Sequence, residues 1–76
     1  MDIKFNYDKL RGRVKEYCKT NREFAKQLGV SEQTIQKKLN CSIPFTQKEI
    51  YKAINTLCIN NNEIASIFFT IEVENN

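Results

Sequence analysis

The stretch that decides the fold is residues 20–40, TNREFAKQLGVSEQTIQKKLN, because two helix starts and one glycine stop coincide in it. Thr20 followed three residues later by Glu23 has the spacing of a capping box, so a helix is predicted to begin directly after Thr20. Gly29 follows the last apolar residue of that helix, where a left-handed cap favours glycine. Ser31 can cap a second helix. The stretch therefore predicts two short helices joined by a tight turn, a helix-turn-helix.

The apolar residues of this stretch fall on one side of each predicted helix. Phe24 and Leu28 have the spacing of an inward-facing side in the first helix, and Ile35 opens the same pattern in the second. A turn this short makes the helices cross at about 90–120°, and the small side chain of Ala25 lets their backbones approach. The second helix then presents only polar side chains to the outside: Glu32, Gln33, Gln36, Lys37 and Asn40.

The remaining sequence predicts three further helices. One is expected over residues 7–18 behind the helix-turn-helix, and a last short one ends near Phe68. Thr46 and Glu49 form a second capping box, which opens a helix running to about Cys58. The predicted fold is mainly α: a compact bundle of five short helices with a helix-turn-helix, and with a short strand at the C-terminal end as an open alternative.

The C-terminal residues 69–74, FTIEVE, alternate apolar and polar side chains, which is typical of a strand. A lone strand needs a partner strand or an apolar surface, and two partners are left open. The tail either makes a two-fold contact with a second subunit or folds back on its own domain, against Ile3 and Phe5. The domain is accordingly predicted over residues 1–68, with residues 69–76 as a tail. The surplus apolar residues predicted to make a dimer contact are Ile67, Phe68, Phe69, Ile71 and Val73.

The composition excludes several classes of protein. The chain has no histidine, and its three cysteines lack C-x-x-C spacing, so we expect no metal, no cofactor and no enzyme activity. Cys18 and Cys58 are expected to be reduced and partly buried on helices. No small-molecule ligand is evident. No run of about 18 apolar residues and no leader is present, so no membrane contact is expected and a location in the cytoplasm of a bacterial host cell is predicted.

The charges are unevenly distributed along the chain. All twelve Lys and Arg residues lie between Lys4 and Lys52, and residues 53–76 carry acidic residues but no base. A basic body with an acidic end suits contact with a polyanion. An equally weighted interpretation is that the lysines only keep a small domain soluble.

The spacing of residues 20–40 resembles the phage Cro and repressor type, the lambda-repressor-like family of helix-turn-helix DNA-binding proteins. The matching positions are Asn21, Ala25, Gly29 and Ile35, which supply an amide, a small residue, a glycine and a β-branched core residue. The resemblance implies a sequence-specific transcriptional regulator, a dimeric Cro-like phage repressor that binds a pseudo-palindromic operator in double-stranded DNA. The choice of a Cro-like role rests on analogy with the family.

In such domains the N-terminal part of the second helix enters the major groove. The residues predicted to contact bases are Glu32, Gln33, Gln36 and Lys37. Glu32 has an alternative role as a first-turn acid that complements the helix dipole. Phosphate contacts on either side are predicted for Asn21, Arg22, Lys38, Asn40, Thr46, Gln47 and Lys48.

A hypothesis from a different class is a small helical protein-interaction module, of the antitoxin or antirepressor type, that binds another regulator. Such a module would need an exposed apolar groove. Its binding would depend little on salt, whereas DNA binding through several phosphate contacts weakens steeply as salt is raised.

Overall fold

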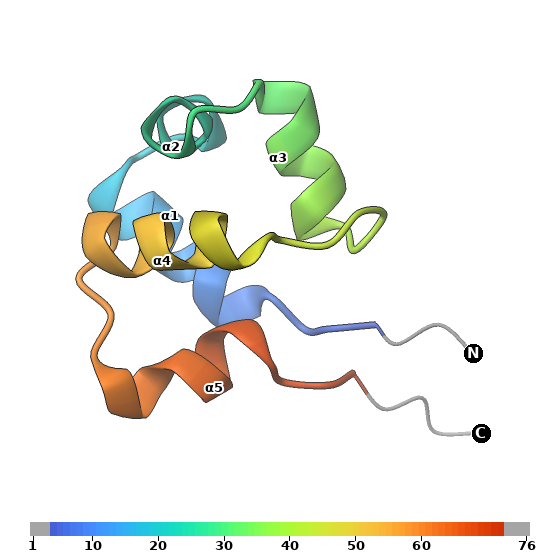
Figure 1. The fold of residues 1–76 in the computed structure, drawn as a ribbon, viewed down its shortest axis with the longest axis vertical. Helices are drawn as coiled ribbons and strands as arrows, with labels where there is room; N and C mark the ends of the chain where they lie inside the picture. The colour runs from blue at the N-terminus through green and yellow to red at the C-terminus, as the bar shows by residue number, and fades with distance from the viewer. Residues whose placement is uncertain (1–3, 73–76) are drawn as a thin grey trace.

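Five α-helices and one 3₁₀ turn make up the computed structural model, which describes residues 4–72 (Figure 1). The predicted mainly α bundle of five short helices is confirmed. None of the helices in this range is long and apolar enough to cross a membrane. The elements are α1 (Asp8–Tyr17), α2 (Asn21–Leu28), α3 (Glu32–Leu39), α4 (Gln47–Thr56), η1 (Asn61–Glu63) and α5 (Ile64–Phe68).

Helices α2, α3 and α4 begin at the capping residues predicted from the sequence, and α2 ends at the predicted glycine. The Thr20 hydroxyl accepts a hydrogen bond from the Glu23 N–H at 3.1 Å, and the Ser31 hydroxyl caps α3 in the same way. Gly29 ends α2 with φ of 79°, a conformation that is cheap only without a Cβ. At Thr46 both halves of the capping box are present. Local hydrogen bonds therefore place the boundaries of α2, α3 and α4.

Two of the cysteines flank helix ends. Cys18 directly follows α1 and is buried, with only 6% of its surface exposed. Cys58 follows the C-terminal cap of α4 with φ of 52°, and it is exposed. The expectation that Cys58 is partly buried on a helix is therefore wrong, because α4 ends at Thr56.

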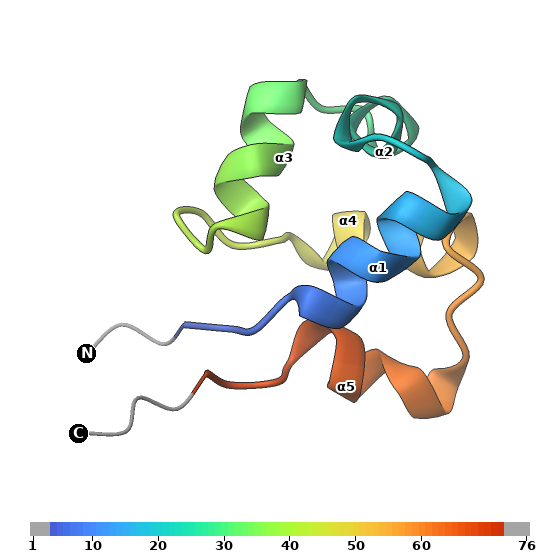
Figure 2. The same cartoon turned by 180° about the vertical axis from the view of Figure 1, so that it is seen from behind.

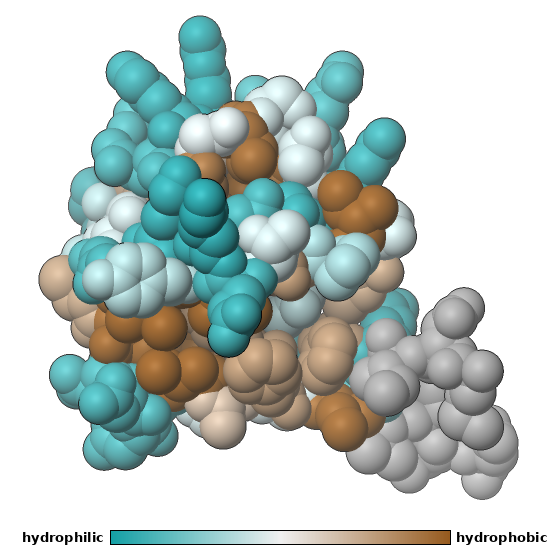
Figure 3. All heavy atoms as spheres, in the orientation of Figure 1, coloured by the Kyte–Doolittle hydropathy of each residue, from teal (hydrophilic) through white to brown (hydrophobic). Residues whose placement is uncertain are grey.

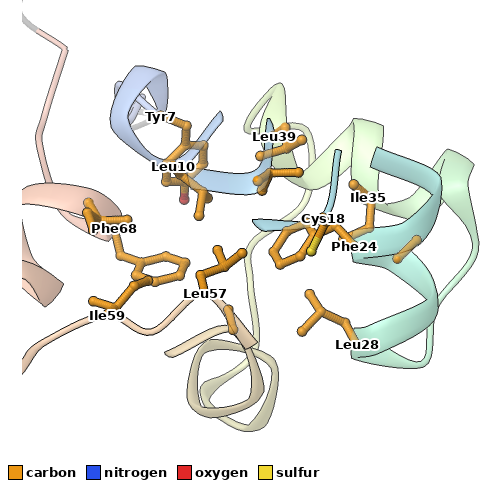
Figure 4. Close-up of a cluster of buried hydrophobic side chains, with 14 residues drawn as sticks. Tyr7, Leu10, Cys18, Phe24, Leu28, Ile35, Leu39, Leu57, Ile59 and Phe68 are labelled. Atoms are coloured by element: carbon orange, nitrogen blue, oxygen red, sulfur yellow. The ribbon is translucent and has the colours of Figure 1, made fainter. Parts of the chain in front are cut away.

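The core lies where all five helices meet (Figure 4). Phe45, from the loop before α4, packs edge-on against Tyr7 at a ring distance of 5.6 Å and against Phe68 at 5.7 Å. This aromatic cluster ties α5 to the rest of the bundle. The largest fully buried side chains are Phe24, Phe68, Leu10, Ile35, Leu57 and Val14.

Two arginines of α1 hold the C-terminal ends of other helices. An Arg11 Nη donates to the Leu39 carbonyl at the end of α3 at 3.1 Å. An Arg13 Nη donates to the Leu57 carbonyl at the end of α4 at 3.1 Å, and its other Nη pairs with Glu63. Cationic donors satisfy carbonyls that a helix end leaves free and complement its dipole. Helix α1 thus fixes α3 and α4 together.

The two ends of the described chain lie side by side (Figures 1 and 2). Phe5 and Ile71 form an antiparallel bridge, flanked by two backbone hydrogen bonds of 2.7 and 2.8 Å. Phe69 also packs edge-on against Phe5, with ring centroids 6.1 Å apart. Of the two alternatives for the tail, the fold-back on its own domain is the one observed. Ile3, the other predicted contact, lies outside the described residues.

The residues predicted for dimerisation do not form one surface. Ile67 and Phe68 are 3% and 1% exposed, because α5 turns them into the core. Phe69 and Ile71 are about half exposed and belong to the terminal bridge region. Val73 lies outside the described residues. The prediction of a dimer contact by this set is wrong for the two core residues, because their apolar surface is already buried within the chain.

Candidate interaction surface

Helices α2 and α3 pack against each other (Figure 1), and the polar residues on the outer side of α3 are exposed. The four residues of this helix predicted to contact DNA bases are all exposed, and within residues 4–72 none of them forms an ion pair. They are Glu32, Gln33, Gln36 and Lys37. This surface is therefore free to contact another molecule.

A groove of about 670 Å³ runs along the junction of α2 with the start of α3. Its apolar lining comes from Ala25 and the half-buried Val30, at the turn between the helices. Its charged lining is balanced between two bases and two acids: Arg22, Lys26, Glu23 and Glu32. Phosphate-binding surfaces carry an excess of positive charge, whereas protein interfaces combine apolar patches with mixed polar rims. The chemistry of the groove therefore suits a protein surface.

Lys38 does not reach the surface on which it was predicted to bind phosphate. Its side chain is 6% exposed, and its ammonium lies 2.7 Å from a Glu49 carboxylate oxygen and 2.9 Å from the Pro44 carbonyl. The prediction of a phosphate contact at Lys38 is wrong. Lys38 comes three residues after the buried Ile35, and residues three apart lie on the same side of a helix. The apolar spacing of α3 could therefore have indicated that Lys38 faces inward.

The other predicted phosphate contacts divide into two groups. The Asn40 amide oxygen accepts a hydrogen bond from an Arg11 Nη at 3.2 Å, and the Thr46 hydroxyl caps α4. Both polar groups already have partners within the fold. The others keep exposed or half-exposed side chains: Asn21, Arg22, Gln47 and Lys48.

The carboxylates with shifted pKa values, Glu49 and Glu63, form hydrogen bonds and ion pairs that hold the fold together. Burial alone would raise the pKa of Glu49, but hydrogen bonds from Lys38 and Thr46 outweigh it and hold that pKa below its ordinary value. The pKa of Glu63 is lowered by the backbone N–H of Asn60 and then by Arg13. Within residues 4–72 no group of three metal-ligating side chains comes together.

Two buried side chains, those of Cys18 and Tyr7, have raised pKa values. Burial raises the pKa of the Cys18 thiol, with a smaller contribution from Glu23. Burial also raises the pKa of the Tyr7 hydroxyl. Both groups stay neutral near pH 7, and a protonated thiol is a poor nucleophile. These side chains therefore act in packing.

Comparison with known proteins now identifies the family. The family described as "Protein of unknown function (DUF739)" matches residues 3–71. The chain belongs to the DUF739 family. Among solved structures, this DUF739 protein is similar to the modulator of repression (MOR) of the temperate bacteriophage TP901-1 from Lactococcus lactis. The two chains are 36% identical with a TM-score of 0.76, and the match covers 92% of this chain and 95% of the other. No curated protein matches it.

These findings correct the identification made from residues 20–40. The related protein is a modulator of repression, and the matching family has no assigned function, so the assignment to Cro and repressor-type DNA-binding proteins is wrong. The expectations of operator DNA and a homodimer as partners are withdrawn with it. The spacing of Asn21, Ala25, Gly29 and Ile35 reports how two helices pack at a sharp turn. It does not report what their exposed side binds.

Proposed function

We propose that this DUF739 protein is a phage modulator of repression that acts as a small helical protein-interaction module and binds another regulator. The observation that carries the proposal is the similarity to the TP901-1 modulator of repression, at 36% identity over nearly the whole of both chains. A match of this extent includes the surface elements as well as the core. It favours the protein-interaction hypothesis over the DNA-binding one.

The chemistry of the α2–α3 groove supports a protein partner. The half-buried Val30 offers apolar contact, and the surrounding charges, including Glu23 and Glu32, are balanced. Carboxylates in this position would repel phosphates but can pair with basic side chains of a protein. We place the contact with the regulator at this groove and on the adjoining exposed residues of α3. The regulator that fits the proposal is the repressor encoded by the same phage genome.

The proposal includes two further expectations. The protein works without catalysis and without a cofactor, which the absence of histidine from the sequence supports. It acts in the cytoplasm of the bacterial host, where a phage repressor acts.

Isothermal titration of the protein into the purified repressor of the same phage tests the proposal. We expect saturable binding to the wild type. A variant that exchanges two charges across the groove, Arg22→Glu with Glu32→Arg, keeps the net charge and should bind at least about tenfold more weakly. In the host, expression of the protein should change transcription from the repressed promoter only when the repressor is present.

Two results would contradict the proposal. One is the absence of binding to the repressor at micromolar concentrations. The other is retardation of the phage switch-region duplex in a gel by the protein alone at physiological salt, since that would return the function to direct DNA contact.

A further inference from the structure

Helix α4 has an exposed side that carries only positive charge. Its one acid, Glu49, has a side chain that is 14% exposed and points to Lys38 and the Thr46 N–H. The two lysines therefore have no compensating acid on their own helix. The exposed residues of α4 are Gln47, Lys48, Tyr51, Lys52 and Asn55.

Tyr51 lies between these lysines in the sequence, and its side chain is largely exposed. Its exposed fraction is 66%, the highest among the exposed large hydrophobic residues. Within residues 4–72 its ring contacts no other ring and no cation. The seven other aromatic side chains are each buried or in contact with a ring or a guanidinium: Phe5, Tyr7, Tyr17, Phe24, Phe45, Phe68 and Phe69.

Lys48 lies three residues before Tyr51 and four residues before Lys52, so both side chains neighbour that of Lys48 on one side of the helix. The Lys52 ammonium lies 3.8 Å from the position that a Cβ on Gly29 would occupy, at the end of α2. Within residues 4–72 neither lysine forms an ion pair. Figure 3 shows hydrophilic and hydrophobic side chains adjoining over α4, on the face that α2 also borders. The charged side of α4 thus reaches the C-terminal end of α2 through Lys52.

We propose that Lys48, Tyr51 and Lys52 form a docking surface for an acidic patch of the regulator. The inference rests on the proposed function. The partner surface would carry carboxylates that pair with the two lysines, and between them an apolar spot that covers the tyrosine ring. Tyrosine is enriched among the residues that dominate binding energy at protein interfaces. Flanking charges of one sign select a partner of the opposite sign and speed its association.

Lys48→Glu tests the electrostatic part of the docking surface. Lys48 is the second residue of α4, where an acid complements the helix dipole, so the variant should fold at least as stably as the wild type. The matched control is Lys9→Glu, since Lys9 is the exposed second residue of α1 and the change of net charge is identical. In titrations against the repressor of the same phage, we expect Lys48→Glu to weaken binding about tenfold or more and Lys9→Glu less than about twofold.

Tyr51→Ala tests the aromatic part, with Tyr17→Ala as the control at another exposed tyrosine. We expect about a 30-fold loss of affinity for Tyr51→Ala and little change for Tyr17→Ala. Circular dichroism of each variant checks that it is folded.

The outcomes separate this inference from the proposed function. If the wild type binds the repressor and Lys48→Glu and Tyr51→Ala bind as their controls do, the docking surface is refuted and the proposed function stands. If the wild type does not bind the repressor, both fail. If Lys48→Glu instead abolishes retardation of duplex DNA by the protein alone, the lysines contact nucleic acid and the acidic protein patch is refuted.

Discussion

The Lys38 ammonium lies 2.7 Å from a Glu49 carboxylate oxygen and so joins the last turn of α3 to the first turn of α4. The same oxygen accepts the Thr46 N–H at 2.9 Å, which completes the cap of α4. Lys38 also donates to the Pro44 carbonyl, inside the loop that connects the two helices. One buried ion pair therefore holds the end of one helix, the connecting loop and the start of the next helix.

Breaking this ion pair on one side should destabilise the protein strongly. Lys38→Met leaves the Glu49 carboxylate largely buried without its partner, which costs about 3 kcal/mol or more of unfolding free energy. The double variant Lys38→Met with Glu49→Gln removes both charges and should recover most of that loss, because the Gln amide oxygen can still accept the Thr46 N–H. Urea unfolding of the four proteins measures the coupling. Additive effects of the two single variants would contradict this account.

The same pair predicts a dependence of stability on acid pH. The folded pKa of Glu49 lies below its ordinary value of about 4.5, so its contribution to stability is complete above that pH. The contribution is lost as the pH falls through the lowered pKa and the carboxylate takes up a proton in the folded state. Urea unfolding at several pH values between 3 and 7 measures this effect. As the pH falls, the unfolding free energy of Glu49→Gln should decrease less than that of the wild type. If the unfolding free energy of the two proteins decreased equally with falling pH, Glu49 would be excluded as a source of the acid sensitivity.

Two residues with a left-handed backbone conformation at helix ends, Cys58 and Gly29, should change the unfolding free energy in opposite directions when they are substituted. Cys58 has φ of 52° and is exposed, so Cys58→Gly should raise the unfolding free energy by about 0.5–1 kcal/mol by removing a strained Cβ. Gly29 has φ of 79° after α2, so Gly29→Ala should lower it by about 1 kcal/mol. Thermal unfolding of both variants measures the two shifts. Shifts of the same sign would show that backbone strain does not govern these positions.

Two adjacent phenylalanines should respond very differently to truncation. Phe68 is 1% exposed within the aromatic cluster, and Phe68→Ala should cost about 3–5 kcal/mol, enough to unfold much of a domain of this size. Phe69 is 50% exposed, so Phe69→Ala should cost much less and leave the far-ultraviolet circular dichroism unchanged. Similar losses for the two variants would place Phe69 in the core as well.

The helix boundaries could be predicted because their causes are local. The hydroxyls of Thr20, Ser31 and Thr46 each accept from a backbone N–H three residues ahead, and Gly29, which has no Cβ, takes the left-handed conformation at the end of α2 at low cost. Each of these interactions lies within about one helical turn of sequence. Any fold that used these residues as helices would begin and end them at the same places.

The candidate surface could be predicted only in part. The exposure of Glu32, Gln33, Gln36 and Lys37 follows from the apolar periodicity of α3. The chemical class of the partner does not follow from it, because packing at a sharp turn constrains the inward residues and leaves the outward ones free. For Tyr51 the sequence leaves two alternatives open, a phosphate contact through its hydroxyl or a place at the edge of the core with the hydroxyl in water.

The sequence by itself determined the five helices, the N-terminal caps of α2, α3 and α4, and the inward sides of α2 and α3, because hydrogen bonds and apolar spacing within a few residues are enough for that. Only the tertiary structure decided that Lys38 is buried, that Phe68 and not Phe69 enters the core, and that the tail pairs with Phe5. Those outcomes depend on residues far apart in the chain, such as Glu49 for Lys38 and Phe45 for Phe68, and no local pattern specifies which of them will meet.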